Sequence, residues 1–160
     1  MTAQDIMTEN PACCTPDDTV EHAAKLMIEH DCGCVPVVED TETNRLVGVV
    51  TERDLACRCL GEGKGPETRV SEVMSENPSC CTPNSEVQEV EQIMATRQVR
   101  RVPVIDDKGC CVGMIAQADL ARAKQVVGNR EVGRVVEQVS EPTGEPRSEL
   151  GAGIRPGATR

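Results

Sequence analysis

The chain has 160 residues, a formal net charge of −10 and no Phe, Tyr or Trp. This composition argues against a nucleic-acid-binding surface, because proteins bind duplexes through a basic stripe and usually bind single strands through aromatic side chains that stack on the bases. No apolar run approaches the roughly 18 residues that suggest a membrane-spanning helix, and the start MTAQDIM lacks the basic and apolar regions of a secretory signal. We therefore expect a cytoplasmic protein with no nucleic-acid or membrane partner, whose thiols stay reduced.

The predicted elements follow the order short helix, strand, helix, strand, strand, helix, and the same order then returns. Apolar residues at helical spacing over 20–28, after a Thr-Pro-Asp-Asp start, predict a capped helix. The runs CVPVVE and LVGVVT are short, rich in Val and separated by turn residues, so they predict paired strands. ERDLACRCL predicts another helix that stops at Gly61, and a Gly-rich linker follows at 63–69.

The second half of the chain repeats the first. DIMTENPACCTPDDTVEHAAKLM at 5–27 matches EVMSENPSCCTPNSEVQEVEQIM at 72–94, an offset of 67 residues. After the turn EDTETN the offset drops to 65, so GVVTERD at 48–54 matches GMIAQAD at 113–119. A turn between paired strands tolerates such a length difference. The sequence therefore predicts one repeat at 1–62 and a second at 70–127, joined by the linker at 63–69.

The repeat ends beyond the second unit. The valines of REVGRVVEQV share one helical face, which predicts a helix at 128–139 that docks against the repeats or a second chain. Residues 140–160 are rich in Gly, Pro, Ser and charge, and this composition predicts a disordered tail.

The stretch GVVTERD places Thr51, Arg53 and Asp54 where a strand ends and a helix begins. The free N–H groups and the dipole of a helix start favour an anion such as phosphate. A threonine hydroxyl and an arginine add donors for that anion, and the aspartate can accept hydrogen bonds from a ribose diol. A capping box of Thr51 and Asp54 is the alternative. Because the second copy has Ala116 but keeps Asp119, a cap alone does not account for both copies.

These motifs together (M…NP…TP, then VPVV, then Gly-x-x-Thr-x-x-Asp) occur twice and resemble a tandem cystathionine-β-synthase (CBS) domain pair, or Bateman module, over about residues 4–125. The resemblance implies an α/β (α+β) fold of two β-α-β-β-α repeats packed in pseudo-twofold symmetry. It also implies two clefts that bind adenine nucleotides (AMP, ADP or ATP) or S-adenosylmethionine as regulatory ligands. No enzymatic reaction and no required cofactor are expected. A homodimer that passes its ligand state to a regulated partner protein is expected instead.

The resemblance assigns residues to each cleft. In the first cleft Asp54 holds the ribose, Thr51 and Arg53 face phosphate, and Val49 lies against the base. The other repeat completes that cleft with Met74, Asn77, Ser79 and Val99. In the second cleft Asp119 holds the ribose, Met114 lies against the base and Arg100 faces phosphate. The first repeat closes it with Met7, Asn10, Ala12 and Cys32. Because only the first cleft has a hydroxyl, we hypothesise two unequal sites, of which the first binds phosphate better.

The ten cysteines fall in five close pairs at 13/14, 32/34, 57/59, 80/81 and 110/111. Adjacent strand residues face opposite sides and no C-x-x-C spacing occurs, so we assign no metal site and interpret the cysteines as buried thiols that act as small hydrophobes. Cys32, near the second cleft, is the first candidate for a functional thiol. Two alternatives therefore stay open beside a nucleotide sensor. One is a structural or dimerisation module that binds no nucleotide, and the other is a thiol-redox or metal-responsive protein.

Overall fold

The computed structural model describes residues 1–127, so the helix predicted at 128–139 and the tail at 140–160 lie outside the described residues. The first repeat contains β1 (Thr8–Glu9), α1 (Val20–Glu29), β2 (Cys34–Val38), β3 (Leu46–Thr51) and α2 (Glu52–Asp54). A π-helical turn, η2 (Leu55–Cys59), and a 3-10 turn, η3 (Leu60–Glu62), continue α2. The second repeat contains β4 (Ser75–Glu76), α3 (Val87–Arg97), β5 (Arg101–Ile105), β6 (Cys111–Ala116) and α4 (Gln117–Val127). A short 3-10 turn opens each repeat, η1 (Ala3–Asp5) in the first and η4 (Val70–Glu72) in the second.

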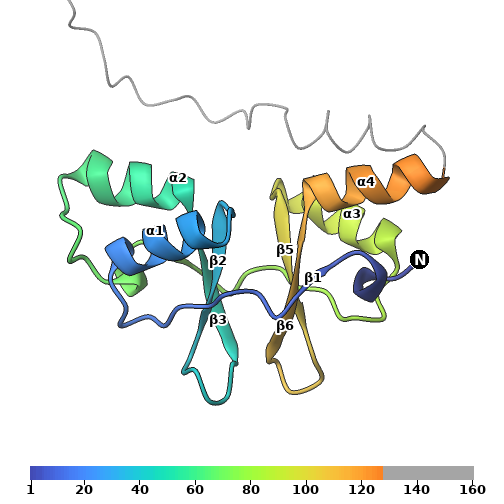
Figure 1. Ribbon diagram of the computed structural model, residues 1–160, viewed down its shortest axis with the longest axis horizontal. Coiled ribbons are helices and arrows are strands. Elements are labelled where there is room, and N and C mark those ends of the chain that lie inside the picture. Colours follow the sequence, from blue (N-terminus) through green and yellow to red (C-terminus); the bar gives the residue numbers. More distant parts are fainter. Residues whose placement is uncertain (128–160) are drawn as a thin grey trace, which may run out of the picture.

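The strands form two antiparallel three-stranded sheets, with the orders β2-β3-β4 and β1-β6-β5. The two sheets stand side by side in the middle of the molecule, with α1 and α2 outside one and α3 and α4 outside the other (Figure 1). This arrangement confirms the predicted α/β fold of two related β-α-β-β-α units.

Helix α1 has a side-chain cap at its start and a residue in the left-handed conformation just after its end. The Thr19 side chain caps the start by accepting a hydrogen bond from the backbone N–H of His22 at 3.2 Å. Val20, Ala23 and Met27 are buried on one face. Just past the end, Asp31 has a φ of 48°, and Gln98 has a φ of 53° at the equivalent place after α3. A residue in the left-handed conformation commonly ends a helix. The same kind of turn therefore connects α1 to β2 and α3 to β5.

The leading segment of each repeat packs on the other repeat. Strand β1 pairs with β6, and β4 pairs with β3. The preceding turns dock in the same crossed way, since the backbone N–H of Ala3 donates to the carbonyl of Ser85 and that of Val70 donates to the carbonyl of Asp18, both at 2.8 Å. Each repeat therefore needs the other to complete its sheet.

Glycine is required where a leading segment lies against the opposite sheet. A Cβ at Gly48 would sit 2.8 Å from the backbone oxygen of Ser75 and 3.1 Å from Sδ of Met74. In the other sheet a Cβ at Gly113 would collide with Sδ of Met7. The glycine that opens both copies of the GVVTERD element thus makes room for the strand that arrives from the other repeat.

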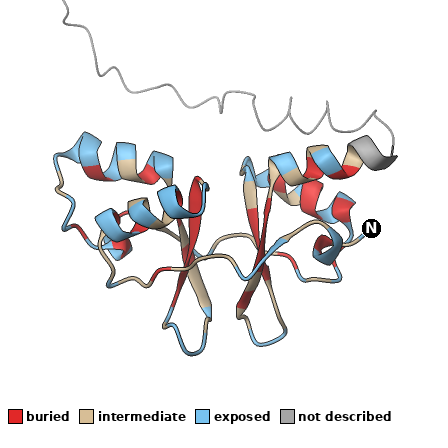
Figure 2. Cartoon of the chain, in the orientation of Figure 1, coloured by how far each residue is buried: buried red, intermediate tan, exposed pale blue. Residues whose placement is uncertain are grey.

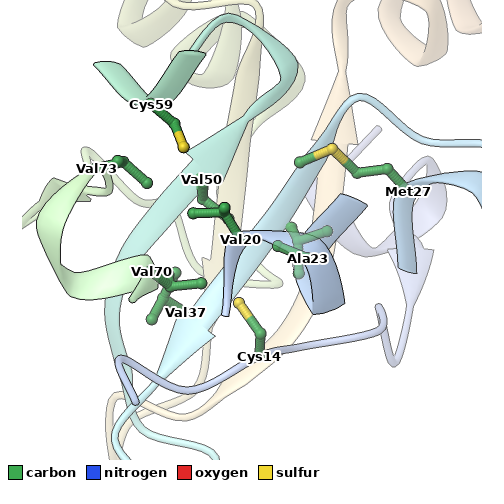
Figure 3. Close-up of a cluster of buried hydrophobic side chains, with 10 residues drawn as sticks. Cys14, Val20, Ala23, Met27, Val37, Val50, Cys59, Val70 and Val73 are labelled. Carbon is green, nitrogen blue, oxygen red and sulfur yellow. The ribbon is translucent and has the colours of Figure 1, made fainter. Parts of the chain in front are cut away.

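Each lobe has its own aliphatic core, with the buried residues concentrated on the strands and on the helix faces that cover them (Figure 2). The core of the first lobe includes Val70 and Val73, which follow the linker at the start of the second repeat and are both fully buried (Figure 3). Its members are Cys14, Val20, Ala23, Met27, Val35, Val37, Val50, Cys59, Val70 and Val73. The core of the second lobe consists of Ala3, Cys81, Val87, Val90, Met94, Val102, Val104, Ile115 and Leu120.

One member of each cysteine pair is buried. These are Cys14, Cys34, Cys59, Cys81 and Cys111. Burial raises the pKa of Cys14, Cys34 and Cys81 to about 12, so these thiols stay protonated at neutral pH. The interpretation of the cysteines as small buried hydrophobes is therefore correct for one of each pair. It is wrong for Cys57, which is exposed, and incomplete for the four half-buried ones.

Candidate functional site

The exchanged strands bring residues of the two repeats together at the predicted first cleft. Val49 of β3 stands opposite Ser75 of β4, and the backbone N–H of Asn77 donates to the carbonyl of Val47 at 3.3 Å. Met74 precedes this strand and lies against Gly48. The base-facing position predicted at Val49 is thus bordered by the segment of the second repeat that carries Met74 and Asn77.

The second cleft has the same construction with the repeats interchanged. Met114 of β6 stands opposite Thr8 of β1, and the backbone N–H of Asn10 donates to the carbonyl of Val112 at 3.1 Å. Asn10 has a φ of 47° and Asn77 a φ of 48°. Asparagine tolerates this left-handed conformation better than most residues, which suits it to the point where each leading segment turns away from the foreign sheet.

A complete capping box occupies the start of α2. The Asp54 Oδ2 atom accepts from the backbone N–H of Thr51 and from the Thr51 hydroxyl, both at 2.9 Å. The hydroxyl oxygen in turn accepts from the backbone N–H of Asp54 at 3.2 Å. The capping interpretation is therefore correct as a description of these contacts. The box uses Oδ2, and within residues 1–127 the one contact of Oδ1 is a long ion pair to Nε of Arg58 at 3.7 Å.

The start of α4 keeps half of this arrangement. The backbone N–H of Ala116 donates to Oδ2 of Asp119 at 2.7 Å, but Ala116 has no hydroxyl to complete the box. Oδ1 of Asp119 accepts from the guanidinium of Arg122, one turn further along the helix. In both repeats one carboxylate oxygen fixes the helix start, and an arginine of the next turn partners the other.

Arg58 ties the first cleft to the second repeat in a way that the sequence did not indicate. Its Nη1 atom donates to the carbonyls of Val73 and Met74, each at 3.2 Å, while its Nε faces Asp54. The side chain thus joins the carboxylate of Asp54 to the backbone that leads into β4. Only its position one helical turn after Asp54 could have suggested this role.

A surface depression of about 550 Å³ lies beside these elements. It is lined by the end of α1, the turn between α1 and β2, the first residue of α2 and the first residue of β5. These residues are Met27, Ile28, Asp31, Cys32, Gly33, Glu52 and Arg101. A Cβ at Gly33 would lie 2.8 Å from both Nη2 of Arg101 and Oε2 of Glu52. Arg101 therefore reaches across from the second repeat to the first. Among residues 1–127 it forms no salt bridge, which leaves its guanidinium available to an anion.

The remaining predicted site residues occupy varied surroundings. Arg53 and Arg100 are exposed, and Arg100 directly precedes the Arg101 of the depression. Ala12 and Ser79 are half-buried, and each directly follows the proline (Pro11 or Pro78) that comes after the strand paired with the other repeat. Val99 packs against the core of its own repeat, and Cys32 packs against the core of the first repeat while lining the depression. Their assignment to ligand contacts stays a prediction.

No group of three or more His, Cys, Asp or Glu side chains within 1–127 is arranged to hold a metal ion. None of the helices in that range is long and apolar enough to cross a membrane.

Two pseudo-symmetric β-α-β-β-α repeats that exchange their leading segments define a tandem-repeat α/β protein whose candidate sites lie where the repeats meet. The chain belongs to the CBS domain family, since the CBS domain model matches residues 3–60 and 70–125. It is 40% identical to the CBS domain-containing protein YhcV of Bacillus subtilis over 118 residues, which are 74% of this chain and 81% of that protein.

Several solved structures share this fold. The crystal structure of Hypoxic Response Protein I with two coordinated zinc ions is 36% identical, with a TM-score of 0.69 over 76% of this chain and 98% of that one. The CBS domain pair of MJ0100, in complex with 5′-methylthioadenosine and S-adenosyl-L-methionine, is 26% identical, with a TM-score of 0.72 over 80% and 98%. CBSX2 in complex with AMP is 26% identical, with a TM-score of 0.69 over 79% and 97%.

Proposed function

We propose that the chain is a regulatory module that binds an adenine nucleotide, or a related adenosyl ligand, between its two repeats. The observation that carries the proposal is the exchange of leading segments between the repeats. It places a segment of one repeat that contains a methionine and an asparagine beside the strand of the other repeat that is predicted to face the base. Relatives with the same fold have been solved with AMP or with S-adenosyl-L-methionine. These complexes make adenosine the ligand class to test first.

The capping box and a ribose contact are compatible at Asp54. A carboxylate has about four lone-pair sites, and the cap engages only Oδ2. A ribose diol would approach Oδ1, where the 3.7 Å ion pair to Arg58 is long enough to rearrange at little cost. Thr51 and Asp54 therefore fix the helix start and leave one oxygen of the same carboxylate for the ligand.

Phosphate binding rests on arginines near the boundary between the repeats. Arg53 and Arg100 are exposed and free to turn toward a ligand. Arg101 is the strongest addition to the predicted set, because its guanidinium already reaches Gly33 of the opposite repeat. Glu52 lies beside it and disfavours a second negative group there. We expect this balance to favour ligands with few phosphates.

The two clefts are proposed to be unequal. Of the two helix starts only the first has a hydroxyl, that of Thr51, which would turn its single proton from Oδ2 of Asp54 to a bound phosphate. Loss of a hydrogen bond to a charged group costs about 1.5–3 kcal/mol. At about 1.4 kcal/mol per decade, this corresponds to roughly a ten- to hundredfold weaker phosphate site in the second cleft.

Ligand binding would act by population shift, since a ligand that touches both repeats favours the arrangement in which its cleft is closed. We propose that a homodimer transmits this state to a regulated protein. Light scattering of the full chain with and without ligand tests the dimer.

A thermal-shift screen of AMP, ADP, ATP, S-adenosylmethionine and NAD tests the function. A ligand at one hundred times its Kd stabilises the folded state by about 2.7 kcal/mol, which raises the melting temperature by roughly 5–11 °C in a chain of this size. The protein contains no aromatic residue, so nucleotide carried through purification would dominate the near-ultraviolet absorbance of a denatured extract. No shift and no such absorbance would favour the structural module. Bound metal in the same sample would favour the metal-responsive alternative.

A further inference from the structure

Arg58 connects two residues that are predicted to line the first cleft, one from each repeat. Its Nη1 atom donates to the carbonyls of Val73 and Met74, each at 3.2 Å, and its Nε atom lies 3.7 Å from Oδ1 of Asp54. Met74 in turn lies against the sheet of the first repeat, since a Cβ at Gly48 would be 3.1 Å from its Sδ atom. One guanidinium therefore spans the Asp54 carboxylate of the first repeat and the leading segment of the second.

The two acceptor carbonyls follow a helical turn, which is why they need a donor. The 3-10 turn η4 ends at Glu72, and the last carbonyl groups of a helix lack partners within it. A basic side chain is a common partner for such carbonyls. Arg58 reaches them from the π-helical turn η2, and single π turns inside helices are rare and frequent at functional sites. Donor and acceptors therefore both lie where the backbone departs from a regular α-helix.

The second cleft is built on the same plan without this connection. Ala123 occupies the place of Arg58, at the offset of 65 residues that relates the two helices, and its side chain has no donor. The equivalent stretch of α4 is regular α-helix. The arginine of that helix, Arg122, instead pairs with Asp119 of its own repeat. The molecule thus supplies an internal comparison for the role of Arg58.

Two opposing effects on a ligand follow from the contacts of Arg58. Its ion pair with Asp54 competes with a ribose, but a 3.7 Å contact to a half-exposed arginine is weak. Its two bonds to the backbone at Met74 have ordinary hydrogen-bond lengths, and they hold that segment beside the strand predicted to face the base. The positioning effect is the larger one, so removal of Arg58 weakens binding rather than strengthening it.

We infer that Arg58 is a positioning residue of the first cleft, which holds the Asp54 carboxylate and the segment leading into β4 as one unit and so couples the docking of β4 on β3 to ligand at Asp54. The coupling to ligand rests on the proposed function. By linkage, a ligand that needs the docked segment stabilises the docking by the same factor by which the docking raises its affinity. The second cleft lacks this coupling because Ala123 cannot provide it.

Amide hydrogen exchange of the ligand-free full chain, followed residue by residue by NMR, tests the docking. The backbone N–H of Asn77 reports on the first cleft and that of Asn10 on the second, since each donates to a carbonyl of the other repeat. Arg58→Ala should speed exchange at Asn77 by roughly tenfold, as expected for the loss of two ordinary hydrogen bonds, and leave Asn10 unchanged. Arg122→Ala, the matched control, should leave both rates unchanged.

A double variant separates positioning from simple packing. Because Asp54→Asn disturbs the same unit, Arg58→Ala/Asp54→Asn should exchange at Asn77 no faster than the faster single variant. Arg58→Lys keeps the charge but loses the fork of donors, so its rate should fall between those of the parent chain and Arg58→Ala. Circular dichroism verifies that each variant folds. An unchanged Asn77 rate in Arg58→Ala, an equal acceleration at Asn10, or additive effects in the double variant would each overturn the inference.

Titration with AMP tests the coupling to ligand separately. Bound AMP should slow exchange at Asn77 in the parent chain, and Arg58→Ala should bind AMP in the first cleft roughly tenfold more weakly. Unchanged or tighter AMP binding by Arg58→Ala would overturn the coupling. A parent chain that binds no AMP would count against the proposed function, and the ligand-free exchange rates decide the role of Arg58 in docking by themselves.

Discussion

Replacing Thr51 by alanine removes two hydrogen bonds at the start of α2 and leaves a third in place. The lost bonds are those of the hydroxyl, one donated to Oδ2 of Asp54 at 2.9 Å and one accepted from the backbone N–H of Asp54 at 3.2 Å. The backbone N–H of residue 51 still donates to the same carboxylate, as that of Ala116 does to Asp119. The variant therefore converts the first helix start into the form already present in the second repeat.

The magnitude follows from this partial loss. Replacement of a threonine N-cap by alanine costs about 1 kcal/mol, within a range of about 0.5–2. The retained backbone bond argues for the middle of the range, because Asp54 is not left unsatisfied. In a chain of this size we expect the melting temperature to fall by roughly 2–4 °C. The reverse change, Ala116→Thr, should raise it by a similar or smaller amount.

Urea unfolding followed by far-UV circular dichroism measures the effect, since the chain has no aromatic residue to report by fluorescence. The expected result is a lower midpoint for Thr51→Ala with an unchanged slope. Thr41→Ala, on an exposed turn between β2 and β3, is the matched control and should leave the midpoint unchanged. A Thr51→Ala midpoint equal to that of the control would refute the capping energetics.

Three further predictions concern the core, a buried ion pair and alkaline stability. Met94 is fully buried, so Met94→Ala should lower the free energy of unfolding by about 2–5 kcal/mol in urea titrations. Ile28 is 80% exposed, so the control Ile28→Ala should change that free energy by less than about 0.5 kcal/mol. Lys124→Met should cost about 3–5 kcal/mol because it strands the buried carboxylate of Glu91, and the double variant Glu91→Leu/Lys124→Met should recover most of this loss. Stability should decline as pH rises from about 8.5 toward 12 in a pH series of melts, because unfolded thiols ionise near the lower value. Three buried thiols, those of Cys14, Cys34 and Cys81, have their pKa raised to about 12 in the fold. A flat profile over that interval would contradict the last prediction.

The sequence predicted the elements because their signals are local. The repeat offset, the β-branched runs and the helix starts gave the element order, and the hairpins β2-β3 and β5-β6 follow from it. The exchange of leading segments has no local signal. Thr8 and Glu9 form too short a strand to stand out, and their partners lie about a hundred residues away. Only the resemblance to a known family indicated that each cleft would draw on both repeats.

The side-chain chemistry of the site was less predictable for the same reason. Thr51 and Asp54 were found because they lie three residues apart on one turn. Arg58 and Arg101 were missed because their roles depend on what crosses over them, the backbone of Met74 in one case and Gly33 in the other.

Isothermal titration of the full chain with AMP and ATP measures whether the two repeats bind an adenosyl ligand. Saturable binding is expected, with Asp54→Ala losing the tighter event and Asp119→Ala losing the weaker one. Thr51→Ala should weaken the tighter event by roughly ten- to hundredfold. Equal losses in the two aspartate variants would contradict the inequality of the clefts. An absence of binding heat at any temperature, for both nucleotides and for S-adenosylmethionine, would contradict the claim that the repeats hold an adenosyl ligand.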